Sequence, residues 1–193
     1  MFAALAPAIA VAISSVAELA AIEIAEGVAG GFEDALGLSP DELEALSVWL
    51  PSLAPARCAS ATARVPCDDE SALRALLCAA CVAPPPLATI LPAIVARRSM
   101  REDHLWQDLG LPHRVALSQF MACAFPSLYA ANDRDMKWKR FFYRALCEAE
   151  GFALCAVPHC RDCADFDRCF GAEDGQSAFA RRARIEVTAA EGA

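Results

Sequence analysis

Four of the chain's ten cysteines lie within one short stretch near the C-terminus, CAVPHCRDCADFDRC. Their spacing is C-x4-C-x2-C-x5-C, and the residues are Cys155, Cys160, Cys163 and Cys169. Pro158 stands in the first gap, and Gly151 ends the preceding helical pattern, so we expect a loop. At 3.6 residues per turn a regular helix would point these four thiols in scattered directions, whereas a loop can turn them toward one point.

Thiols gathered at one point are oxidised to disulfides, held by a metal, or kept apart. The chain has 193 residues and is 56% hydrophobic, so it can bury a core without disulfides. Cys160 and Cys163 have the short spacing that zinc and iron–sulfur sites share. The wider flanking gaps match neither the two-pair zinc pattern nor the tight ferredoxin run. The spacing therefore favours a metal centre and leaves zinc and an iron–sulfur cluster both open.

Three residues beside these cysteines are candidates for a supporting role. Arg161 and Arg168 are placed to offset the negative charge of bound thiolates or to donate hydrogen bonds to sulfur. His159 directly precedes Cys160, so it is a candidate ligand or a residue that lines the site. A solvated surface position is the alternative for both arginines.

Two further candidates lie outside the stretch. His104 stands in REDHLWQDLG, where three carboxylates surround one imidazole, an unusual density of hard ligands. A charged helix end is the simpler alternative. Cys147 lies on a helix face opposite the apolar stripe that begins at Trp138, so we expect it to be able to face the cysteine loop. Cys81 and Cys123 are expected to pack in the core.

The rest of the chain predicts helices. An Ala-rich helix is expected over residues 8–26. Ser39 and Glu42 form a capping box around Pro40 and start a second helix. Further helices are expected over residues 69–81, 92–106, 112–125 and 135–150. In the last of these, Asn132 or Asp133 is the expected cap.

We find no period-two alternation, so the predicted fold is all-α: a single helical domain with a C-terminal cysteine-rich metal-binding loop. The expected divisions are an N-terminal helical segment (1–50), a linker (51–68), a helical core ending in the cysteine loop (69–172), and a mobile tail (173–193).

Charge and motifs argue against several classes of function. The net charge of -8 argues against binding nucleic acid, because contacts with the phosphate backbone need positive charge. No Lys or Arg precedes the N-terminal apolar run, and glutamates interrupt it, so we expect a domain helix rather than a signal or membrane span, and a cytoplasmic protein. No nucleophile–base pair or phosphate-binding glycine loop is visible, so we expect no enzyme.

Several stretches together resemble one known family. They are HLWQDLGL (104–111), the pair Phe125-Pro126, N-x2-DMKWKRFFYRALCE (132–148) and C-x4-C-x2-C-x5-CFG. This combination resembles the NifQ family, and the resemblance is dense over residues 94–173. It implies a nitrogen-fixation protein that holds an iron–sulfur cluster, takes up molybdenum and supplies it for the nitrogenase iron–molybdenum cofactor. It also implies that the four cysteines of the motif are the cluster ligands. The implied partners are the cofactor scaffold complex and the nitrogenase iron protein.

Within this reading, we hypothesise that three cysteines each bind one iron of a three-iron cluster. Molybdenum then fills the open corner, completed by the fourth cysteine or by a ligand such as His104. One alternative is a zinc-stapled helical module in which DMKWK is a docking face. A dithiol redox enzyme is a weaker alternative, because the expected βαβ context is missing.

Overall fold

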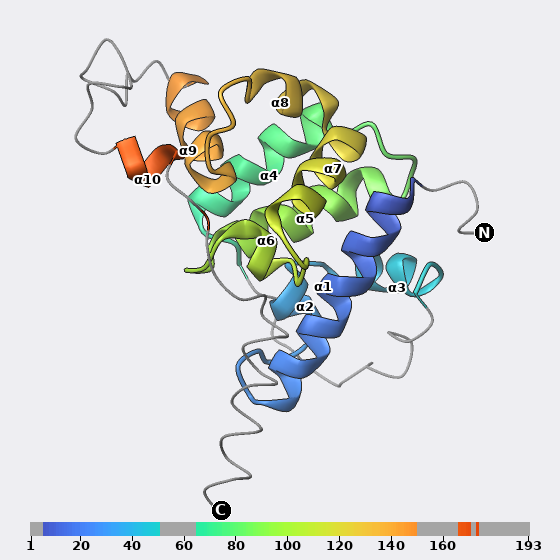
Figure 1. Cartoon of the computed structure of the whole chain (residues 1–193). Coiled ribbons are helices and arrows are strands. Elements are labelled where there is room, and N and C mark those ends of the chain that lie inside the picture. The colour runs from blue at the N-terminus through green and yellow to red at the C-terminus, as the bar shows by residue number, and fades with distance from the viewer. Residues whose placement is uncertain (1–5, 51–64, 150–165, 171–172, 174–193) are drawn as a thin grey trace, which may run out of the picture.

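The computed structural model describes residues 6–50, 65–149, 166–170 and 173 (Figure 1). Every regular element in these ranges is a helix, which confirms the all-α prediction for this part of the chain. Most of the predicted cysteine loop lies outside the described residues, as does most of the predicted linker and tail.

Helix α5 (Leu87–Ser99) lies in the interior and contacts α2, α3, α4 and α6 (Figure 1). It is buried on nearly all sides, as expected for a helix without a polar face. The prediction of a helix over residues 92–106 is wrong, because Pro92 lies inside α5 rather than at its start. A proline costs one backbone hydrogen bond within a helix, and the burial of the apolar side chains around it outweighs that cost.

The N-terminal helix α1 (Pro7–Ala25) packs against α2 (Phe32–Leu36) and α7 (Arg114–Ala124). Among the described residues it is the one helix long and apolar enough to cross a membrane, and 44% of its apolar window is buried inside the protein. Ile13 and Val16 are almost completely buried. This packing agrees with the predicted domain helix and accounts for its apolar composition.

Two local features define the end of α2 and the start of α3 (Pro40–Ser47), and both helices pack on α5. Gly37 has a φ of 70°, and a Cβ built there would lie 2.6 Å from Cβ of Arg97. Only glycine therefore allows this approach. The predicted capping box is confirmed, because Glu42 N–H donates to Ser39 Oγ at 3.2 Å and Ser39 N–H donates to Glu42 Oε2 at 3.0 Å. Glu42 also pairs with Arg74 of α4 (Asp68–Ala80).

The C-terminal half adds α6 (Leu105–Asp108), α8 (Pro126–Ala131), α9 (Trp138–Ala149) and α10 (Phe166–Phe170). Trp138 and Phe142 are buried, which confirms the start of the predicted apolar stripe on α9. Met136 is buried in the turn before the helix. Cys81 packs against the core, but Cys123 is exposed, so its predicted core position is wrong. Cys123 lies outside the buried face of α7, which is centred on Leu117, Met121 and Ala124.

A buried ion pair joins the end of α1 to the end of α5. Arg98 is completely buried, and its Nη1 donates to both carboxylate oxygens of Glu23 at 2.8 Å. Arg101 adds a second contact to Glu23 at 3.2 Å. Burial lowers the pKa of Arg98, and the Glu23 carboxylate opposes that change.

We predict that Arg98→Met destabilises the protein by about 3–5 kcal/mol, because Glu23 then keeps a buried charge without its main partner. Urea unfolding measures this loss. Arg144→Met is the control, since Arg144 pairs with the exposed Glu148 on α9 and its loss should cost less. The double variant Glu23→Leu/Arg98→Met should regain most of the stability. An Arg98→Met variant no less stable than Arg144→Met would contradict the prediction.

Candidate metal centre

Helix α10 carries Cys169, the member of the four-cysteine motif that the structure describes. Cys155, Cys160 and Cys163 lie outside the described residues, as do His159 and Arg161. Arg168 belongs to α10, but its side chain is not among those described. Within the described ranges no three metal-binding side chains gather at one point. The geometry therefore shows how Cys169 is held, and the ligand set remains a prediction.

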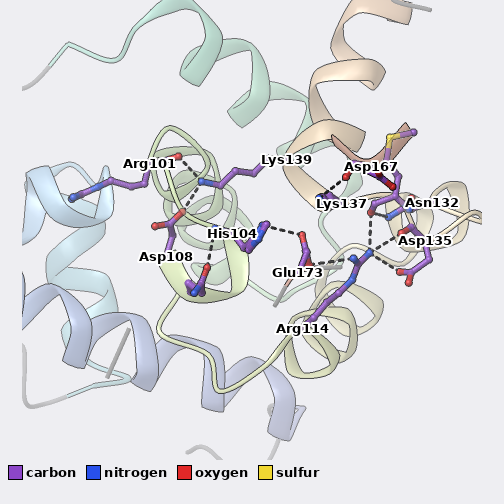
Figure 2. A network of polar contacts seen from close by, with 12 residues as sticks. Arg101, His104, Asp108, Arg114, Asn132, Asp135, Lys137, Lys139, Asp167 and Glu173 are labelled. Carbon is purple, nitrogen blue, oxygen red and sulfur yellow. Dashed lines mark hydrogen bonds and ion pairs between the residues drawn. The ribbon is translucent and has the colours of Figure 1, made fainter. Parts of the chain in front are cut away.

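Lys137 holds the C-terminal end of α10 (Figure 2). Its backbone N–H donates to the Cys169 carbonyl, and its Nζ donates to the Asp167 carbonyl, both at 2.8 Å. The last carbonyls of a helix have no partner within the helix, and a cation there also suits the helix dipole. A five-residue helix is too short to be stable alone. These contacts, with the packing of Cys169 and Phe170 on the core, therefore fix its position.

The turn before α9 presents Lys137 to α10. Asn132 closes this turn, because its Nδ2 donates to the Met136 carbonyl and its Oδ1 accepts from Met136 N–H, both at 2.9 Å. Asp135 has a φ of 52°, a left-handed conformation that Asp tolerates better than most residues. The predicted cap of α9 by Asn132 or Asp133 is thus wrong. The helix begins at Trp138, and Asn132 folds the turn instead.

Arg114, the first residue of α7, connects this turn to the segment that follows Cys169. Its Nη2 donates to the Asp135 carbonyl at 2.7 Å, to Asp135 Oδ1 at 2.8 Å and to the Met136 carbonyl at 3.2 Å. Its Nη1 lies 3.2 Å from Oε2 of Glu173. One guanidinium on α7 therefore contacts two segments that are distant from it in sequence, the turn before α9 and Glu173 (Figure 2).

Glu173, four residues after the last cysteine of the motif, forms an ion pair with His104. Its Oε1 lies 3.5 Å from Nδ1 of His104, and its side chain is 4% exposed. Glu173 is four residues after Cys169, so the structure places the predicted candidate His104 beside this segment. Sequence reasoning missed Glu173. The sequence feature that could have indicated Glu173 is the carboxylate in CFGAE, four residues after the last cysteine.

The sequence predicted that Asp108 would be one of three carboxylates around His104. In the structure Asp108 pairs with Lys139 instead. The Asp108 side chain accepts from Lys139 Nζ at 2.5 Å, and Lys139 also donates to the Arg101 carbonyl at 2.5 Å. Burial raises the pKa of Asp108, and the nearby Lys139 opposes the increase. The pair joins α6 to α9, and His104 N–H donates to Gln107 Oε1 at the start of α6.

Cys147 is half-buried on α9 and lines a groove with Tyr143 and Leu146, between α9, α4 and the end of α5. It belongs to no group of three potential ligands in the described part of the chain. Its role as a ligand remains a prediction.

Comparison with known proteins gives one consistent family. The model of the family described as NifQ matches residues 15–171, a range that includes all four cysteines of the motif. A protein named "Protein NifQ homolog" from Sinorhizobium fredii is 47% identical over 113 residues, which cover 58% of this chain and 49% of that protein. "Protein NifQ" from Rhodobacter capsulatus is 47% identical over 53% of this chain and 57% of its own length. "Protein NifQ" from Azotobacter vinelandii is 40% identical over 55% of this chain and 54% of its own length.

The chain therefore spans about half the length of the curated relatives that it matches. No solved structure matches it.

Asp108 gives a testable pH dependence. Because its pKa in the folded chain lies above the ordinary value of 3.8, the folded chain binds more protons than the unfolded chain between the two values. The contribution of Asp108 to the free energy of unfolding therefore falls as pH rises through this window. We predict that the stability of the wild type relative to Asp108→Asn decreases with rising pH there. Urea unfolding at a series of pH values checks this, and a rising difference would contradict it.

Lys137 gives a second prediction. Lys137→Ala removes the bond to the Asp167 carbonyl, which we take to contribute about 1 kcal/mol, so α10 should open about five-fold more often. The backbone N–H of residue 137 is bonded to Cys169, so its hydrogen exchange should accelerate by the same factor. Lys137→Arg keeps a donor and is the control. Equal exchange rates in wild type and Lys137→Ala would show that the side chain does not hold α10.

Proposed function

The chain belongs to the NifQ family, and from this premise we propose that it is an iron–sulfur protein that carries molybdenum for biosynthesis of the nitrogenase iron–molybdenum cofactor. NifQ proteins are nitrogen-fixation proteins. The observation that carries the proposal is the four-cysteine motif within the matched range, whose last member, Cys169, is held on the helical core by Lys137.

The donor chemistry supports a sulfur-bound metal. Thiolates are soft ligands that hold iron–sulfur clusters, and such a cluster offers sulfide that can bind a further metal. Cys169 is half-buried and its backbone is fixed by Lys137, so its thiol has a defined place at the edge of the helical core. Cys155, Cys160 and Cys163 supply the other thiolates in this proposal.

A carrier must also release its cargo. The contacts that hold α10 include two bonds from Lys137 and the packing of Cys169 and Phe170, and α10 lies at the edge of the domain (Figure 1). Segments with few buried contacts open at a lower free energy than the core. This arrangement favours a carrier over a catalyst. The cofactor scaffold complex and the nitrogenase iron protein are the proposed partners, and the cytoplasm is the proposed compartment.

Cys160→Ser tests the iron–sulfur centre. Purified without oxygen, the wild type should be brown and contain iron, sulfide and molybdenum, whereas Cys160→Ser should lose the visible absorption and most of the iron. Cys123→Ser is the matched control, because Cys123 is exposed on α7 outside the motif.

Two outcomes would reject this proposal. Wild-type iron content in Cys160→Ser would remove its ligand role. A colourless wild type that contains zinc would support the zinc-stapled module instead.

A further inference from the structure

Glu173 is a buried carboxylate with incomplete hydrogen bonding. Its side chain is 4% exposed, and Oε2 is buried and accepts no hydrogen bond within the described part of the chain. Its contacts are the ion pairs with Arg114 at 3.2 Å and with His104 at 3.5 Å. A buried carboxylate normally accepts several hydrogen bonds, because its desolvation is otherwise costly. This carboxylate is therefore held away from solvent by two ion-pair partners, Arg114 and His104.

The surrounding residues orient the two ends of this carboxylate differently. Arg114 is fixed by three oxygens of the turn at Asp135 and Met136, and it contacts Oε2. Oε1 is then the oxygen turned toward Nδ1 of His104 (Figure 2). His104 is anchored in turn by the bond from its N–H to Gln107. A carboxylate oxygen and an imidazole nitrogen from distant segments thus converge.

We propose that His104 Nδ1 and Glu173 Oε1 form a nitrogen–oxygen donor pair for the molybdenum cargo, with Arg114 as the positioning residue for the carboxylate. This inference rests on the proposed function. Two donors bound to one metal at about 2.1 Å in neighbouring positions lie about 3 Å apart, so the 3.5 Å separation needs only a small shift. Glu173 follows Cys169, the last cysteine of the motif, by four residues in the sequence.

The pair also differs chemically from the cysteines. Imidazole and carboxylate suit harder metals than thiolates do. Iron held by thiolate and sulfide does not need the pair, whereas a metal bound to the cluster's sulfides at an open corner still needs further ligands. Glu173 should therefore affect the retention of molybdenum but not of iron.

The test uses the full chain purified without oxygen and loaded with iron, sulfide and molybdate. In Glu173→Gln we expect at least a ten-fold lower molybdenum-to-iron ratio with wild-type iron content and visible absorption. His104→Ala should give the same result, and the double variant should lose no more than either single variant. X-ray absorption at the molybdenum edge should lose its nitrogen and oxygen contribution while keeping sulfur.

Glu148→Gln is the matched control, because Glu148 is an exposed residue that pairs with Arg144 on α9. A wild-type molybdenum-to-iron ratio in Glu173→Gln would overturn the inference. So would equal loss of iron and molybdenum, because Glu173 would then only tether the segment after Cys169.

With either of these two Glu173→Gln results, the wild type would still carry iron and molybdenum, and the proposed function would stand. A wild-type chain that takes up no molybdenum would overturn both proposals.

Discussion

The contacts of Arg114 and Lys137 with the turn at residues 132–137 determine where the end of the cysteine motif lies. Arg114 fixes the turn through backbone and side-chain oxygens, and Lys137 then binds α10. Each such bond contributes on the order of 1 kcal/mol, so together they position α10 without locking it. The DMKWK stretch, which is part of the resemblance to the family, thereby gains a structural role: it receives the segment that carries Cys169.

The stability of the domain has a different source. Helix α5 is buried on nearly all sides, and its fully buried Arg98 binds the buried carboxylate of Glu23. The Lys139–Asp108 pair extends this rigid part to α6 and α9. His104, Arg114 and Lys137 therefore project from well-packed helices or from the turns beside them, while α10 is attached at the edge. In the proposed carrier, this rigid support would stay folded while the segment that carries Cys169 opens.

Local sequence signals predicted local structure well. The capping box of Ser39 and the start of the apolar stripe at Trp138 depend on residues a few positions apart, and both are confirmed. The predicted helix start at Pro92 is wrong, because the burial of the apolar side chains of α5 outweighs the backbone hydrogen bond that the proline loses. His104 was predicted from its neighbours Asp103 and Asp108, yet Asp108 pairs with Lys139, and the carboxylate that faces His104 comes from Glu173. Such a contact between distant segments depends on the packing of α6, α7 and α10, which no local pattern encodes.

The pairing of Glu173 with both Arg114 and His104 also bears on how a cargo could leave. A metal site made of buried charged ligands usually resists emptying, because each ligand loses its partner when the metal departs. Here the carboxylate keeps Arg114 on one oxygen and turns the other toward the imidazole. The emptied pair therefore still has compensating contacts. In the proposed carrier, this compensation would lower the free-energy cost of release, while Arg114 would hold the carboxylate in place for the next metal.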